Sequence, residues 1–139
     1  MRYIAPDSLA TAVKLLHAEA GLARVLAGGT DVLAQLKAGM VEPDLLLDIK
    51  RIPGLSSIVE EAGGFRIGAA VPSAMLSEQE ALRKAWPGVV EASNLIGSTQ
   101  IQGRATIVGN LCNASPAADS VPALVAAGGV ASNQAVRAA

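Results

Sequence analysis

Two short segments of small and hydroxyl-bearing residues offer the hydrogen-bond donors that an anionic ligand needs. The first, Ala27-Gly28-Gly29-Thr30, lies between an apolar stretch of strand length and residues at helical spacing. Absent side chains let the backbone approach a ligand there, and a helix start adds positive potential. The second, Thr106-Ile107-Val108-Gly109-Asn110, predicts another such turn, with Asn113 and Asp119 close behind it. Two such turns could clamp a pyrophosphate from both sides.

Each segment also has an ordinary structural interpretation. A Gly-Gly pair between a strand and a helix often serves only close packing, and neither segment matches Walker A or G-x-G-x-x-G. Asp119 could simply cap the helix that follows it. Arg104 is either a phosphate contact or a solvated residue of a strand. The residues alone therefore indicate an anion site without specifying its ligand.

Side chains suited to catalysis are scarce. The chain contains one histidine, His17, and one cysteine, Cys112. We expect neither a His/Cys metal cluster nor a catalytic triad, with His17 on a helix surface and Cys112 in the core. The sequence predicts no catalytic residue and no metal ligand, so a cofactor would perform any reaction.

Composition excludes several classes of partner. The 139 residues are 51% hydrophobic and 17% charged, with 11 basic and 12 acidic side chains. Only three are aromatic, Tyr3, Phe65 and Trp86, so neither a basic footprint nor a stacking platform for nucleic acid is expected. No apolar run approaches the ~18 residues of a membrane span, and the N-terminus lacks a signal peptide. We expect a cytoplasmic protein without a membrane span.

The first part of the chain predicts a small α/β layer. An amphipathic helix begins after Asp7 or Ser8 and ends at Gly21. A strand at 24–27, a helix at 32–40 and a strand at 44–49 form a βαβ unit with parallel strands. Patterning changes at Pro53-Gly54, so we predict one subdomain at 1–53 and a second at 54–139.

The second part mixes strands and helices. Residues 57–60 and 65–70 flank a Gly-Gly turn and predict a β-hairpin. Ser73 is predicted to cap a helix that reaches Leu82, and Pro87 to open another. Apolar and polar residues alternate over 101–109, which predicts an extended segment, and a last helix begins near Asp119. The tail from Gly128 is weakly patterned.

Three strings occur in an order that points to a known family: Leu26–Leu33, Ile67–Val71 and Ala105–Asp119. Together they resemble the FAD-binding medium subunit of the molybdenum hydroxylases, a family that covers xanthine dehydrogenases and aerobic carbon monoxide dehydrogenases. The similarity extends from the N-terminus to about Ala127.

The resemblance implies an α/β (α+β) fold of the FAD-binding PCMH type. A small N-terminal βαβ subdomain is followed by a partial mixed-sheet subdomain with helices, and the dinucleotide lies between them. It favours a ligand role for Asp119 over capping. By this resemblance the pyrophosphate is bound from one side by Ala27, Gly28, Gly29, Thr30, Asp31 and Val32 and from the other by Thr106, Gly109 and Asn110, while Asn113 and Asp119 hydrogen-bond the phosphate–ribitol region.

The implied function is electron transfer. A molybdenum-cofactor large subunit would oxidise the substrate, a small subunit with 2Fe-2S clusters would relay electrons, and FAD would pass them to an external acceptor. Val108 departs from the glycine usual in the family, and the chain stops before the family's remaining sheet and C-terminal domain. The alternatives are a truncated, non-catalytic interaction fragment that does not hold FAD alone, and a module for another nucleotide.

Overall fold

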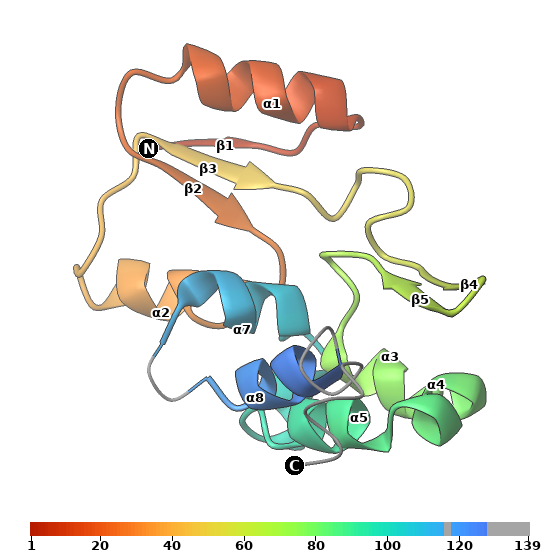
Figure 1. Cartoon of the computed structure of the whole chain (residues 1–139). Helices are drawn as coiled ribbons and strands as arrows, with labels where there is room; N and C mark the ends of the chain where they lie inside the picture. The colour runs from red at the N-terminus through yellow and green to blue at the C-terminus, as the bar shows by residue number, and fades with distance from the viewer. Residues whose placement is uncertain (116–117, 128–139) are drawn as a thin grey trace. The chain divides into compact units, whose positions relative to one another are not determined.

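The computed structural model describes residues 1–115 and 118–127 (Figure 1). Its contacts divide the chain into two compact units, Met1–Val71 and a second that begins at Pro72. Two small β-sheets lie in the first unit, and helices form the described part of the second. This mixture confirms the predicted α/β fold class. Within the described residues, no helix is both long enough and apolar enough to cross a bilayer.

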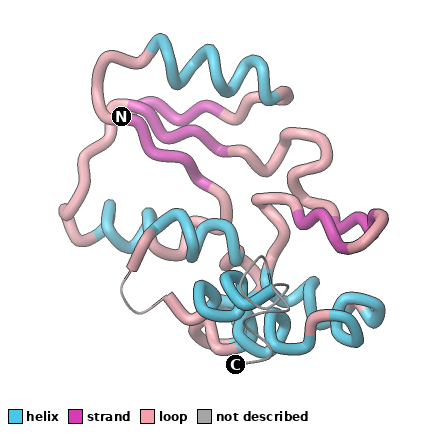
Figure 2. Tube along the Cα trace, viewed as in Figure 1, coloured by secondary structure: helices cyan, strands magenta, loops and turns pink. Residues whose placement is uncertain are grey.

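A parallel sheet organises the first unit (Figure 2). It contains β1 (Arg2–Ile4), β2 (Ala23–Leu26) and β3 (Leu45–Asp48), in the order β1-β3-β2 with both pairings parallel. The central strand β3 is buried along its whole length, as is usual in parallel sheets. The predicted βαβ unit is confirmed, with α2 at Val32–Lys37. Patterning did not predict β1, because its three mostly exposed residues form no apolar run.

Helix α1 (Leu9–Ala18) lies along one face of this sheet (Figure 1). Ser8 is its N-cap and accepts a hydrogen bond from Thr11 N at 3.2 Å, which satisfies one free N–H of the first turn. Its buried Ala12 packs with Leu45 and Leu47 of β3. The predicted helix is therefore confirmed, and the hydrophobic layer between α1 and β3 forms a core of the first unit.

The predicted hairpin is also present. Strands β4 (Ile58–Glu61) and β5 (Gly64–Ile67) pair antiparallel, so Ala62 and Gly63 form the turn. Gly63 has a φ of +86°, a conformation that glycine adopts without a steric penalty. The hairpin therefore forms where the glycine of the turn and the strand patterns on both sides of it predict the same structure.

Gly68 joins this hairpin to the turn that precedes it. Gly68 N donates to Ser57 O at 2.9 Å and Ala70 N donates to Leu55 O at 2.7 Å. A Cβ at Gly68 would lie 2.3 Å from the Leu55 carbonyl oxygen. The backbone contacts keep the hairpin with the first unit, whose limit is Val71, whereas composition predicted a boundary after residue 53.

The second unit corrects two local predictions. Gln79, at φ −85° and ψ 99°, interrupts the helix predicted from Ser73 to Leu82, and Ser73 is its first residue rather than its cap. The segment 101–109 is not one extended strand: residues 101–102 end one helix, 103–104 form a turn, and 107–109 begin another helix. The described helices are α3 (Ser73–Glu78), α4 (Glu80–Ala85), α5 (Pro87–Asn94), α6 (Thr99–Gln102), α7 (Ile107–Asn113) and α8 (Ser120–Val125).

Two hydroxyl caps favour the two helices, α6 and α7, between which the alternating segment is divided. Ser98 accepts from Ile101 N at 3.4 Å, and Thr106 accepts from Gly109 N at 2.9 Å. Each cap satisfies a first-turn N–H of the helix that follows. The weak-patterned tail from Gly128 lies outside the described residues.

Replacing Gly68 with alanine should destabilise the chain by roughly 1–3 kcal/mol, because the new Cβ would collide with a backbone carbonyl that cannot move aside. Gly64→Ala is the matched control in the same hairpin, since a Cβ there meets nothing within 4 Å. Thermal and urea unfolding of the two variants would measure the difference. Equal stability of both variants would contradict the close-approach argument.

Candidate functional site

The first predicted segment lies at the carboxyl edge of the parallel sheet. Ala27 follows β2, and Val32 begins α2. Buried Gly29 has a φ of +81°, and a Cβ there would lie 2.7 Å from Leu26 Cδ1 and 3.1 Å from Leu33 Cδ1. Gly29 is therefore required by backbone conformation and close packing, whatever the segment binds.

The backbone of this segment presents donors. The carbonyls of Gly29 and Asp31 accept hydrogen bonds from the backbone N–H groups of α2, from Leu33 at 3.0 Å and from Gln35 at 2.9 Å respectively. In the part of the chain that the structure describes, the N–H groups of 28–32 donate to no other group. The exposed Asp31 makes no side-chain capping bond to α2. The arrangement suits an anion, because unpaired backbone N–H groups are the donors that phosphate oxygens need.

A buried carboxylate that the sequence interpretation did not identify lies beside the segment. Asp48, at the end of β3, is 5% exposed. Its Oδ2 accepts from the Tyr3 hydroxyl at 2.6 Å and from Lys50 Nζ at 2.8 Å, and its Oδ1 from Lys50 N at 2.9 Å. Lys50 Nζ also donates to the Ala27 carbonyl at 3.2 Å. The available signal was an aspartate ending an otherwise apolar strand.

These contacts shift the pKa values of both Asp48 and Tyr3. Burial by itself raises the pKa of the Asp48 carboxyl, but the hydrogen bonds from Lys50 and Tyr3 and the Lys50 charge outweigh burial and lower it. The hydrogen bond to Asp48, then desolvation and the carboxylate charge, raise the pKa of Tyr3. At neutral pH, Asp48 is therefore a carboxylate and Tyr3 a phenol that donates to it.

The second predicted segment is not a turn but the cap and first turn of α7. Thr106, buried at its N-cap, uses its hydroxyl to accept from Gly109 N. A Cβ at Gly109 would lie 2.8 Å from that Thr106 oxygen. Val108, which precedes Gly109 in the sequence, is half-buried. Thr106 and Gly109 thus have a structural task, since both build the helix start.

Asn110 links α7 to α8. Its Oδ1 accepts from Ser120 Oγ at 2.6 Å and from Ser120 N at 3.4 Å. This bond holds the start of α8 against α7, so the carbonyl end of the Asn110 amide is engaged inside the second unit. Ser120 is fully buried, so the contact belongs to that unit's interior.

Asn113 and Asp119 are the predicted site residues whose side chains are exposed in the second unit. Asp119 occupies the N-cap position of α8 without a side-chain capping bond, so the capping interpretation is wrong. Two further interpretations are corrected, because Cys112 is exposed rather than in the core and exposed Arg104 follows α6 rather than lying in a strand.

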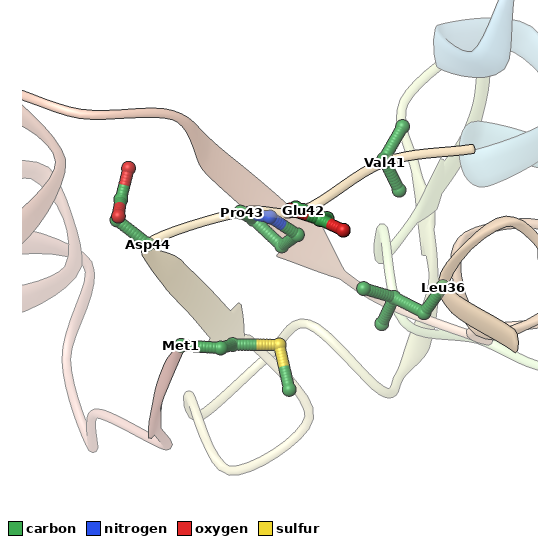
Figure 3. A pocket seen from close by; sticks show the side chains of 6 residues that line it. All are labelled: Met1, Leu36, Val41, Glu42, Pro43 and Asp44. Atoms are coloured by element: carbon green, nitrogen blue, oxygen red, sulfur yellow. The ribbon is translucent and has the colours of Figure 1, made fainter. Parts of the chain in front are cut away.

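The structure therefore brings 27–32 together with Asp48 and Lys50 in the first unit, and Thr106, Gly109 and Asn110 together in the second. A hollow of about 410 Å³ lies at the opposite, amino edge of the sheet, between the residues before β1 and β3 (Figure 3). It contains none of the predicted site residues. Its lining consists of Met1, Leu36, Val41, Glu42, Pro43 and Asp44.

Comparisons with known proteins match nearly the whole chain. A family described as "FAD binding domain in molybdopterin dehydrogenase" matches residues 1–135. The carbon monoxide dehydrogenase medium chain of Hydrogenophaga pseudoflava is 37% identical over 88% of this chain and 42% of its own length. The xanthine dehydrogenase FAD-binding subunit of Escherichia coli O157:H7 is 38% identical over 85% of this chain and 41% of its own length.

Solved structures give the same result. The reconstituted CO dehydrogenase of Oligotropha carboxidovorans aligns with a TM-score of 0.80 at 36% identity, over 86% of this chain and 42% of that one. The Hydrogenophaga pseudoflava enzyme aligns with a TM-score of 0.79 at 35% identity, over 84% and 40%. The chain thus spans about two fifths of the length of the relatives that it matches.

Gly29→Ala should lower the stability of the flavin-free chain by roughly 2–4 kcal/mol, since it combines an unfavourable φ with a clash against Leu26 and Leu33. Gly39→Ala separates the two causes, because Gly39 has a φ of +67° but no atom within 4 Å of a new Cβ. We expect it to cost only about 1–2 kcal/mol. Chemical unfolding of both variants measures the difference, and equal losses would argue against packing at Gly29.

Asp48→Asn should reduce the acid sensitivity of the first unit. The native carboxyl has a lowered pKa, so its stabilisation is complete above the pKa of the unfolded chain and is lost as pH falls through the native pKa, below about pH 4. The variant should therefore be less stable than wild type at pH 7, with the difference shrinking towards pH 3. Unfolding curves between pH 3 and 7 measure this.

Glu61→Gln is the control for that pH series. It also removes one carboxylate of an ion pair, with Arg66 at 2.5 Å, but both side chains are largely exposed. Exposed pairs contribute little to stability, so this variant should follow wild type. A pH dependence in Asp48→Asn identical to wild type would show that Asp48 is not the titrating group.

Proposed function

Because the chain belongs to the family of FAD binding domains in molybdopterin dehydrogenases, we propose that it is part of the FAD-binding, electron-transfer subunit of a molybdenum hydroxylase. Membership of this family confirms the resemblance read from the three sequence motifs and the predicted cofactor, FAD. The observation that carries the proposal for this chain is the row of N–H groups over 28–32 that donate to no other group in the described residues.

In this proposal the first unit holds the pyrophosphate through its backbone. Phosphate oxygens accept hydrogen bonds from the backbone N–H groups of Gly28, Gly29, Thr30, Asp31 and Val32. Ala27 is the first residue of this segment and follows β2 directly. A small residue at 28 and a left-handed one at 29 suit a backbone that must approach an anion closely. Bound FAD supplies the redox chemistry, and the protein supplies orientation and electrostatics.

The second unit contributes side chains and a helix start. We propose that Thr106 and Gly109 shape the start of α7 for a phosphate contact. Asn110 donates through its amide nitrogen, because its Oδ1 already accepts from Ser120. Asn113 and Asp119 hydrogen-bond the phosphate–ribitol region, a role that their exposure allows. Val108 places a branched side chain in the first turn of α7, where we expect it to weaken FAD affinity.

The partners follow from the same proposal. Relatives of this chain are named as medium chains or FAD subunits of dehydrogenases, for example of carbon monoxide and xanthine dehydrogenases. We therefore propose a molybdenum-cofactor large subunit and a 2Fe-2S small subunit as partners, with electrons leaving FAD to an external acceptor. The cytoplasmic location stays a prediction.

One observation favours the second candidate, an interaction fragment that does not hold FAD alone. Large apolar side chains are exposed in both units, among them Met40 at 73% and Leu95 at 68%. Exposed apolar area of this kind commonly marks a surface that another protein segment covers. In that case the fold remains but flavin affinity needs the partners.

Titration of the purified chain with FAD distinguishes these candidates. Binding should quench flavin fluorescence and raise the melting temperature as the FAD concentration rises, because ligand binding to the native state adds to its stability. Competition with ADP and NAD tests the module for another nucleotide. Neither quenching nor stabilisation at saturating FAD would favour the interaction fragment.

Asn113→Ala and Asp119→Ala test the site without disturbing the fold. Both side chains are exposed, and Asp119 makes no capping bond, so the flavin-free variants should melt as wild type does. Each should weaken FAD binding about tenfold, which corresponds to ~1.4 kcal/mol for a lost hydrogen bond to the ligand. The control is Glu91→Gln, an exposed position on α5. Wild-type affinity in both test variants would remove them from the site.

A further inference from the structure

Lys50 connects two strand ends at the carboxyl edge of the sheet. Its ammonium lies 2.8 Å from Asp48 Oδ2, at the end of β3, and 3.2 Å from the carbonyl oxygen of Ala27, just after β2. Its own backbone N–H donates to Asp48 Oδ1 at 2.9 Å, which holds the residue at both ends. The side chain remains 37% exposed, so the ammonium lies at the surface of the edge.

We infer that Lys50 is a positioning residue for the glycine segment, because it sets the orientation of the Ala27–Gly28 peptide. The chain has no cis peptide bond among its described residues. In a trans peptide the carbonyl and the next N–H point in opposite directions. Holding the Ala27 carbonyl on the ammonium therefore directs the Gly28 N–H away from Lys50, as a free donor.

The alternative orientation explains why this peptide needs an anchor. Glycine accepts backbone angles that other residues avoid, so the Ala27–Gly28 peptide could rotate without a steric penalty at Gly28. Rotation would turn a carbonyl oxygen, rather than an N–H, to the side where the donors lie. A carbonyl repels a phosphate, so a flipped peptide would replace attraction by repulsion.

The anchor is itself held in place. Asp48 is buried and accepts from Tyr3 at 2.6 Å, so the carboxylate that holds Lys50 has a fixed position. The pair of Asp48 and Lys50 carries no net charge, so we assign Lys50 to the orientation of the peptide rather than to direct attraction of phosphate. The consequence for FAD rests on the proposed function, whereas the ordering of the segment does not.

The test has a readout that needs no flavin. In the ¹⁵N-labelled, flavin-free chain, Lys50→Met should shift the amide signals of Gly28 and Gly29. It should also lower their order parameters from roughly 0.85 towards 0.6 or less, while β3 is unchanged. Lys50→Arg restores the cation and should restore the order. The control is Lys84→Met, because Lys84 is exposed and pairs only with Glu80 in the described residues.

Ligand binding supplies the second readout. Lys50→Met should weaken FAD and ADP about tenfold, since both carry a pyrophosphate, and should leave the affinity for riboflavin, which has no phosphate, unchanged. The outcomes separate the two proposals. Failure of the wild-type chain to bind FAD counts against the proposed function alone, and the order parameters then decide the role of Lys50.

Two results would overturn the inference. The first is a glycine segment that keeps wild-type order parameters in Lys50→Met. The second is a loss of order spread evenly over β1, β2 and β3, which would make Lys50 a general stabilising residue. Should Lys50→Met fail to fold, Lys50→Ala takes its place, and the same two results in that variant would overturn the inference.

Discussion

A buried carboxylate holds the carboxyl edge of the parallel sheet in the first unit together. Burying a charge is unfavourable unless hydrogen bonds and an opposite charge compensate for the lost water. Asp48 meets that condition through Tyr3 from β1 and through both the backbone and the ammonium of Lys50. The same ammonium binds the Ala27 carbonyl after β2. The geometry of the glycine segment therefore depends on all three strands at once, although it occupies only a few residues.

In the second unit, the equivalent constraint is that the free backbone N–H groups at the helix starts need hydrogen-bond partners. Short helices are only marginally stable by themselves, so their free N–H groups need partners. Thr106 supplies one to α7, and Asn110 receives both donors of Ser120 at the start of α8. Thr106 and Asn110, which could contact a cofactor, therefore also stabilise the starts of α7 and α8. Because Asn113 and Asp119 are exposed, substitutions at these two residues test the proposed ligand contacts with less effect on the fold than substitutions at Thr106 or Asn110.

Sequence patterns predicted the elements whose signals are local and agree with one another. The apolar run of β3, the glycines after β2 and the turn at Gly63 each indicate one structure, and the structure confirms them. Prediction failed where two signals overlapped. Alternation over 101–109 suggested a strand, but Ser98 and Thr106 stand where hydroxyls cap helices, and capping prevails. Cys112 was assigned to the core by residue type, although its helix exposes that position.

The sequence by itself determined the family, the cofactor and which residues could act as small, donor-rich contacts, because these depend on residue types and short spacings. The tertiary structure alone decided which of them have structural partners, and it added Asp48 and Lys50. The reason is physical: Tyr3, Ala27 and Asp48 meet only when β3 lies between β1 and β2. Strand order is a property of long-range pairing, and no local pattern in a chain specifies it.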